Sequence, residues 1–342
     1  MSFEIIILIF AVLMAFAVAF AAGSNDEMMA PGVAAGAFSL RTAVILGAIF
    51  SVLGVFLGEA VVKTLGEDLI KGNTLTNAMV ITVLLVMIII LVGHVTIIPL
   101  PISTTQIVVG AIIGVAITAG FTYSEWGINA VDYWVLLLIF LGWILSPLIG
   151  FAVAATVHFW IQRLDESVEG FTGKQKKDQA YIYALSLFLI ISSASRAGND
   201  VANSIAPVLG LTILESETIT TNMWVMMLIG GLGMALGLII IGKIVIRVVA
   251  KELVEMTPSS GLSSMISVTL IMTLGTLLGF PLSGTHVLIA AMIAVGWAER
   301  SPIQRKMVKT IVISWIVTVP VAAILGGVIW FGVNWLFLGL GL

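Results

Sequence analysis

Two short polar motifs interrupt long apolar runs in this chain of 342 residues. They are PISTTQ at residues 101–106 and PLSGTH at residues 281–286. In each motif a proline stops one helix, and hydroxyl residues suit the first turn of the next helix. The free N–H groups and the positive dipole end of such a helix attract an anion. The two motifs therefore predict a site for a tetrahedral oxyanion.

Hydroxyl groups and one glycine backbone would surround this oxyanion from two sides. The glycine permits an approach that a side chain would block. The alternative is that the hydroxyls only bond to helix carbonyls, but a motif that occurs twice disfavours it. The predicted anion-binding residues are Ser103, Thr104, Thr105, Ser283, Gly284 and Thr285.

Acids and amides form a second pair of motifs, Asn25-Asp26 and Asn199-Asp200. Ionisable groups within a membrane are costly and usually functional. An aspartate beside an anion site is useful if a cation binds there, and sodium takes carboxylate, amide and carbonyl oxygens. The alternative is a helix cap or a wet loop. The predicted sodium-binding residues are Asn25, Asp26, Gln106, Asn199, Asp200 and Asn203.

Two further residues are candidates for contact with substrate or cation. Glu27, next to Asp26, is either a third acid of the site or a surface residue. His286 occupies the position that Gln106 holds in the first hydroxyl motif. A neutral histidine would accept a hydrogen bond from phosphate, which donates near neutral pH, whereas sulfate only accepts. Packing at a helix end is the alternative for His286.

The composition identifies an integral membrane protein, since 60% of the residues are hydrophobic and 10% are charged. The formal net charge of −3, without a basic cluster, does not indicate a nucleic-acid partner. Runs that suit a hydrocarbon core of ~30 Å predict ten crossings among membrane lipids. The predicted spans are 4–22, 42–62, 76–98, 105–120, 132–160, 181–194, 221–242, 262–280, 285–298 and 310–340.

The polar motifs belong to an internal repeat. The Asn-Asp pairs, the glycine motifs LGVFLG and LGMALG, and the hydroxyl motifs recur in the same order at offsets of 174, 179 and 180 residues. Because the first half crosses the membrane an odd number of times, the second half enters from the opposite side and is inverted relative to the first. The predicted fold is an all-α integral membrane protein of two inverted repeats with broken or re-entrant helices. The predicted parts are residues 1–162, a cytoplasmic connector at 163–180, and residues 181–342.

Lysine and arginine predict the orientation, because positive loops stay cytoplasmic. With the N-terminus outside, the inside loops hold twelve of these residues and the outside loops hold three, Lys63, Lys71 and Arg196. Both termini are therefore predicted to be extracytoplasmic in the cell membrane. The connector is predicted to be a solvated loop.

At its motifs the chain resembles the inorganic phosphate transporter (PiT) family of sodium- or proton-coupled symporters. The resemblance lies in GSND at 23–26, AGNDVANSIAP at 197–207 and the two hydroxyl motifs, and the two-half layout covers nearly the whole chain. It implies that the hydroxyl motifs bind phosphate and the acidic motifs bind the driving cation. It also implies a homodimer and about a dozen membrane segments, with 27–38 and 201–214 as candidate half-helices.

One position departs from the family pattern. Met29 stands where the second half has Asn203, so the two cation sites are expected to be unequal. Sulfate transport and proton coupling stay open as alternatives on the same fold. A membrane enzyme is disfavoured because Ser283 and His286 have no third group to orient the histidine. An anion channel is disfavoured because paired half-helices with buried acids favour alternating access.

Overall fold

The computed structural model describes residues 3–71, 75–166, 171–209 and 219–340. This described part is helical apart from turns, connections and two isolated β-bridges. The helices of the first half are α1 (Phe3–Ser24), α2 (Ala30–Ala34), α3 (Leu40–Gly54), α4 (Glu59–Lys63), α5 (Asn77–Ile97), α6 (Thr104–Ala119) and α7 (Tyr133–Glu166). Those of the second half are α8 (Phe171–Leu209), α9 (Ile219–Gly237), α10 (Lys243–Glu252), α11 (Pro258–Leu277), α12 (Gly284–Ala298) and α13 (Arg305–Gly339).

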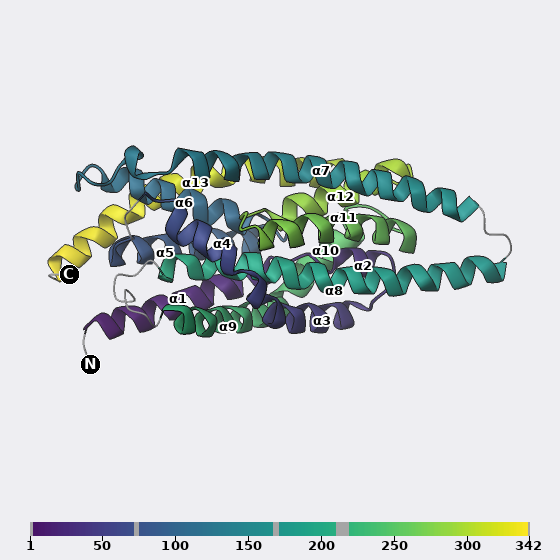
Figure 1. Cartoon of the computed structure of the whole chain (residues 1–342), viewed down its shortest axis with the longest axis horizontal. Coiled ribbons are helices and arrows are strands. Elements are labelled where there is room, and N and C mark those ends of the chain that lie inside the picture. The colour runs from purple at the N-terminus through teal and green to yellow at the C-terminus, as the bar shows by residue number, and fades with distance from the viewer. Residues whose placement is uncertain (1–2, 72–74, 167–170, 210–218, 341–342) are drawn as a thin grey trace.

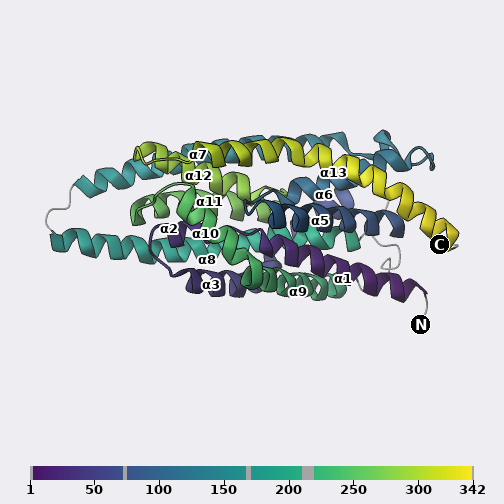
Figure 2. The same ribbon diagram turned by 180° about the vertical axis from the view of Figure 1, so that it is seen from behind.

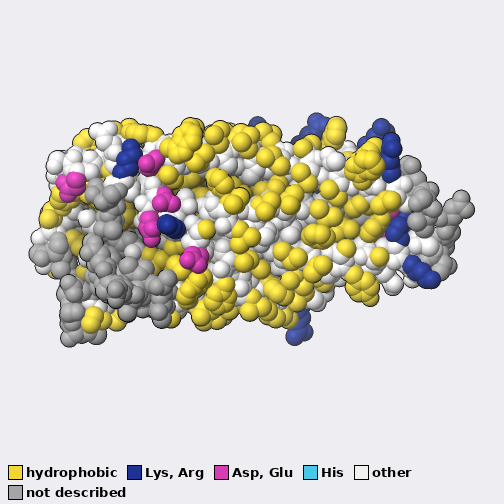
Figure 3. Space-filling model, viewed as in Figure 1, with side chains coloured by type: hydrophobic (Ala, Val, Ile, Leu, Met, Phe, Trp, Pro, Cys, Tyr) yellow, Lys and Arg dark blue, Asp and Glu magenta, His cyan; other side chains and the backbone are white. Residues whose placement is uncertain are grey.

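The helices run along the long axis of an elongated bundle (Figure 1). Eight described helices are long and apolar enough to cross a membrane. On the face drawn in Figure 3 a hydrophobic band occupies the middle, with acids, lysine and arginine towards one end and lysine and arginine towards the other. This distribution is typical of a multi-pass membrane protein, because charged groups remain in water at the two ends.

Two pairs of helices form re-entrant hairpins. Helices α5 and α6 lie side by side in the half of the bundle that holds the termini, and α11 and α12 lie side by side in the other half (Figures 1 and 2). The connection within each pair is one of the two hydroxyl motifs with the residues just before it. The chain therefore enters from one side, turns inside the bundle at the motif, and returns to the same side.

The prediction of ten full crossings is wrong at the two hairpins, which take the place of the predicted spans 76–98 and 105–120 in the first half and 262–280 and 285–298 in the second. Helix α6 has 16 residues and α12 has 15. At a rise of ~1.5 Å per residue, each is shorter than a hydrocarbon core of ~30 Å. Replacing two crossings by one hairpin in each half leaves the parity unchanged, so the second half remains inverted.

The two acidic motifs differ in backbone structure. Residues 25–29 connect α1 to α2 without helix, and the half-helix predicted at 27–38 is only the five residues of α2. The second motif lies inside α8, which continues without a break to Leu209 and contains Pro207. The half-helix predicted at 201–214 is therefore wrong for residues 201–209, and residues 210–214 lie outside the described part.

The predicted solvated connector at 163–180 is mainly helical. Helix α7 extends to Glu166 and α8 begins at Phe171, so only residues 167–170 lie outside the description. Asp165 forms an ion pair with Lys177 at 2.8 Å and accepts a hydrogen bond from the Tyr181 hydroxyl at 2.6 Å. These contacts join the two long helices at the end of the bundle opposite both termini (Figure 1).

The glycine motifs pack helices closely within the chain. Gly54 of LGVFLG lies against α8, where an added Cβ would be 2.1 Å from the Ala194 carbonyl oxygen. Gly237 of LGMALG lies against α1, where an added Cβ would be 1.9 Å from the Phe20 carbonyl oxygen. Only a residue without a side chain permits these distances.

Gly54→Ala is expected to lower the thermal unfolding midpoint of the detergent-solubilised protein by several degrees. The new methyl group would overlap the Ala194 carbonyl and separate α3 from α8, and overpacking of this kind costs ~1–3 kcal/mol. Gly93→Ala in α5 is the matched control, because an added Cβ there meets nothing within 4 Å. An equal midpoint in both variants would show that the α3 contact does not require glycine.

Candidate functional site

The tips of the two hairpins meet in the interior of the bundle. The Thr105 hydroxyl at the start of α6 donates to the Leu282 carbonyl, just before α12, at 3.0 Å. Ser103 and Ser283 cap the two helices and accept hydrogen bonds from the backbone N–H groups of Gln106 and His286. Both helices therefore begin as their motifs predict, with their positive ends close together.

Every predicted site residue is buried, and the hydroxyl and acidic motifs contact each other. The Thr104 hydroxyl donates to Asp200 Oδ1 at 2.7 Å. The Asn203 amide donates to the Thr105 hydroxyl at 3.0 Å. The buried residues are Asn25, Asp26, Glu27, Ser103, Thr104, Thr105, Gln106, Asn199, Asp200, Asn203, Ser283, Gly284, Thr285 and His286. Two groups that are about 100 residues apart in the sequence thus form one polar cluster.

Arg196 is at the centre of this cluster, although the distribution of lysine and arginine predicts it in an outside loop. That prediction is wrong: Arg196 lies inside α8 and is 2% exposed. Its Nε lies 3.3 Å from Asp26 Oδ1 and 3.0 Å from Asp200 Oδ2. Arg196 precedes Asp200 by four residues, so both lie on one face of α8, and this spacing is the local signal for their pairing.

Glu27 is the main partner of Arg196. The Arg196 terminal nitrogens donate to Glu27 Oε1 at 2.6 Å and to Oε2 at 3.1 Å. Glu27 is fully buried, so the surface alternative for it is wrong. A further donation from Arg196 reaches the Thr285 hydroxyl at 3.2 Å. The guanidinium thus joins the acidic motif of the first half to the hydroxyl motif of the second.

Asn25 holds the tip of the first hairpin. Its amide nitrogen donates to the Ile102 carbonyl at 2.7 Å, and its amide oxygen accepts from the Ile102 N–H at 3.0 Å. The nitrogen and the oxygen of the Asn25 amide are thus both bonded to the backbone of Ile102. In this arrangement Asn25 positions the hydroxyl motif.

Three other predicted sodium ligands keep free oxygens. Gln106 Oε1, Asn199 Oδ1 and Asn203 Oδ1 are buried and lack a hydrogen-bond partner within the described residues. A buried carbonyl oxygen without a donor is costly, because it has lost its hydrogen bonds to water. A hard cation would satisfy such oxygens, and the Asn203 amide nitrogen lies 3.5 Å from Asp200 Oδ1. These residues fit sodium.

His286 has one free nitrogen at the start of α12. Its ring lies 4.0 Å from the Trp315 ring, and Nδ1 donates to the Trp143 carbonyl at 3.4 Å. Nε2 is then an acceptor, and it has no partner within the described part of the chain. His286 therefore fulfils both alternatives: it packs at a helix end and offers an acceptor.

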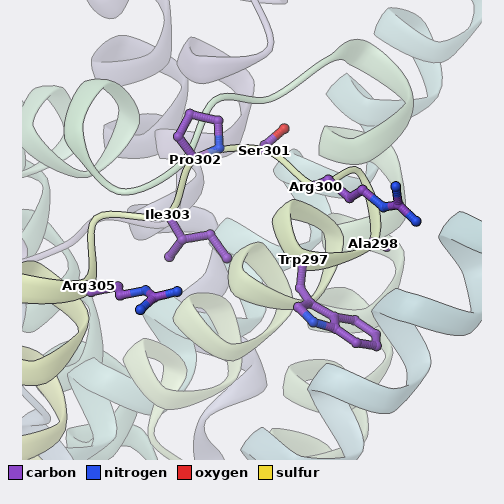
Figure 4. Close-up of a pocket in the computed structure, with 7 residues that line it drawn as sticks. All are labelled: Trp297, Ala298, Arg300, Ser301, Pro302, Ile303 and Arg305. Atoms are coloured by element: carbon purple, nitrogen blue, oxygen red, sulfur yellow. The ribbon is translucent and has the colours of Figure 1, made fainter.

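A pocket of about 690 Å³ lies elsewhere, in the connection between α12 and α13 (Figure 4). Its lining residues are Trp297, Ala298, Arg300, Ser301, Pro302, Ile303 and Arg305. None of them belongs to the hydroxyl or acidic motifs. The candidate site is therefore the buried cluster at the hairpin tips rather than this open pocket.

Comparison with known proteins relates most of the chain to a known family. A sequence model of the phosphate transporter family matches residues 27–326. A protein of Pyrococcus furiosus that is provisionally named a phosphate permease is 29% identical over 94% of this chain and 95% of its own length. The sodium-dependent phosphate transporter 2 of Xenopus laevis is 32% identical over 171 residues, 47% of this chain and 26% of its own length.

A solved structure shares the fold. The structure titled "The sodium-dependent phosphate transporter" superposes with a TM-score of 0.83 at 23% sequence identity. The match covers 96% of this chain and 99% of that one. The architecture of broken helices and paired hairpins is therefore that of a solved transporter over nearly its whole length.

Proposed function

This chain belongs to the phosphate transporter family, and we propose that it imports inorganic phosphate coupled to sodium by alternating access. The family resemblance predicted from the motifs is confirmed, and the protein is a multi-pass membrane transporter of phosphate rather than an enzyme. The proposal adds the coupling ion, the direction and the way in which the site opens.

The observation that carries sodium coupling is the set of free amide oxygens in the hydroxyl and acidic motifs. Gln106, Asn199 and Asn203 each offer a buried amide oxygen without a donor. Carboxylate and amide oxygens together suit a small hard cation. Bound sodium would also offset the negative charge of the acids, which otherwise repels phosphate over these short distances. Phosphate then binds better with sodium present, and sodium binds better with phosphate present.

Phosphate would bind where the two hairpin tips meet. The hydroxyl motifs offer Ser103, Thr104, Thr105, Ser283, Thr285 and the Gly284 backbone, from two helix N-termini that approach each other. Transporters of inverted repeats place their substrate at such an interface near the bilayer centre. Movement of one repeat against the other would open the site to each side in turn.

His286 and the acids favour phosphate over sulfate. Near neutral pH phosphate carries a proton that it donates, and an unpartnered His286 Nε2 or a carboxylate would accept it. Sulfate has no such proton, so the same acceptors would face its oxygens unfavourably. Sulfate transport and proton coupling are the outcomes that the experiment below separates from this proposal.

We further propose a homodimer in the cell membrane with both termini extracytoplasmic. The termini lie at the end of the bundle opposite the α7–α8 connection (Figure 1). That connection contains Arg163, Lys174, Lys176 and Lys177, which favour the cytoplasmic side.

The test is uptake of radiolabelled phosphate into proteoliposomes under an inward sodium gradient, a proton gradient, or neither. We expect uptake that requires sodium and that excess unlabelled sulfate does not inhibit. Uptake driven only by the proton gradient would show that the coupling ion is the proton rather than sodium. Uptake of labelled sulfate instead of phosphate would contradict the selectivity assigned to His286 and the acids.

A further inference from the structure

The two halves of the chain differ at Arg196, at two residues next to it and in the acidic motif. The repeat offsets match each of these residues to one in the other half. The matched residues, first half before second, are Ala22 and Arg196, Glu27 and Val201, Met29 and Asn203, and Thr104 and Gly284. The arginine, its glutamate partner and the glycine against it thus occur once each, without a counterpart.

The guanidinium lies between the two motif aspartates. Its Nε is 3.3 Å from Asp26 Oδ1 and 3.0 Å from Asp200 Oδ2. Glu27 holds the other end through two hydrogen bonds, and such bidentate pairs fix the geometry of an arginine. The positive charge is therefore held where a cation shared by both aspartates would lie.

Gly284 provides the space for this arginine. A Cβ at position 284 would lie 3.0 Å from Arg196 Cδ and 3.1 Å from Nε. Thr104, the matched residue of the first half, instead has a side chain that donates to Asp200. The Arg196 side chain thus occupies the volume that a second threonine would fill.

Oxygen ligands for sodium are already used or missing at the first acidic motif. The Asn25 amide oxygen accepts a hydrogen bond from the Ile102 N–H. Asp26 Oδ1 accepts a hydrogen bond from the Met28 N–H at 2.9 Å and also faces Arg196. Met29 has no oxygen to offer. The second motif differs, because Asn199 and Asn203 both keep unpartnered amide oxygens.

We propose that Arg196 is a resident cation that takes the place of a coupling sodium ion between Asp26 and Asp200. This inference rests on the proposed sodium coupling and specifies it: one sodium ion binds per chain, at Gln106, Asn199, Asp200 and Asn203. Arg196 and Glu27 carry opposite charges, so the pair leaves the total charge of the site unchanged. Arg196 thus replaces a sodium ion, which would travel with phosphate, by a cation that stays in the protein.

The first test is the number of sodium ions bound by the unmodified protein. Equilibrium binding of ²²Na to the purified transporter at saturating phosphate is expected to reach one ion per chain. The sodium gradient that just balances a fixed phosphate gradient in proteoliposomes should give the same number. Two or more sodium ions per chain would overturn the inference while leaving sodium coupling intact.

The second test gives the first half the ligands that it lacks. The variant E27V/M29N/R196A/G284T carries at each position the residue of the other half and keeps the net charge of the site. We expect its sodium count to rise by one. M29N alone, which retains Arg196, is the control and should keep the wild-type count. An unchanged count in a folded fourfold variant would contradict the inference.

A third readout needs no transport. G284T alone should lower the thermal unfolding midpoint, because its side chain would collide with Arg196, and R196A should relieve that loss in the double variant. Additive losses would show that Arg196 does not occupy this volume. If neither ²²Na binding nor a sodium effect on uptake is found in any protein, the proposed sodium coupling itself fails, and this inference fails with it.

Discussion

Asp200→Asn is expected to abolish sodium-stimulated phosphate uptake, with an initial rate at least about a hundred-fold below wild type. The Asp200 carboxylate is buried, accepts from the Thr104 hydroxyl and pairs with Arg196. Removing one partner of a buried ion pair destabilises the fold by ~3–5 kcal/mol, so folding of the variant has to be checked separately. The substitution also removes the charged ligand for sodium, so cation binding fails with it.

The measurement is radiolabelled uptake into proteoliposomes, with size-exclusion chromatography to show that the variant is folded. Asp132→Asn is the matched control. Asp132 caps the start of α7 by accepting from the Trp134 and Val135 N–H groups, a task that asparagine performs equally well. If sodium stimulates uptake by the Asp200→Asn variant as much as by the wild type, Asp200 is not part of the cation site.

Replacing Thr105 and Thr285 together by valine is expected to weaken phosphate binding about a hundred-fold. Valine retains the shape of threonine and removes the hydroxyl from each of the two hairpin tips. A hydrogen bond to a charged group contributes ~1.5–3 kcal/mol, so two such losses reach about 3 kcal/mol or more. The dissociation constant for labelled phosphate at saturating sodium measures the effect.

Thr82→Val is the control for this double variant. Thr82 is equally buried, but its hydroxyl donates to the Ala78 carbonyl of its own helix, α5, rather than to the hairpin tips. Its replacement should leave phosphate affinity within about two-fold of wild type. If the double variant also binds phosphate with wild-type affinity, the two hydroxyl motifs do not form the anion site.

The repeat and the polar motifs could be predicted from sequence because each is local. A proline followed by hydroxyl residues specifies a helix start, and Ser103 and Ser283 cap α6 and α12 accordingly. The hairpins could not be recognised from hydrophobicity, which is the same for a short apolar helix as for a spanning one. The signal was the length of the apolar runs at 105–120 and 285–298, which already match the short helices α6 and α12.

Arg196 was missed for a different reason. An arginine that follows an apolar run is typical of a loop at the membrane surface. Its main partner, Glu27, is 169 residues away in the sequence. Such a pairing depends on how the two inverted halves face each other, which no local spacing specifies. The unequal cation sites expected from Met29 are consistent with this asymmetry.

The central claim is that sodium and phosphate bind together at the hairpin tips, and equilibrium binding of labelled phosphate to the purified protein tests it most directly. Phosphate is expected to bind much more tightly in sodium than in choline at equal ionic strength. By reciprocity, phosphate should increase the affinity for ²²Na by the same factor. Equal phosphate affinity in sodium and choline would show that the two ions do not bind together at the hairpin tips.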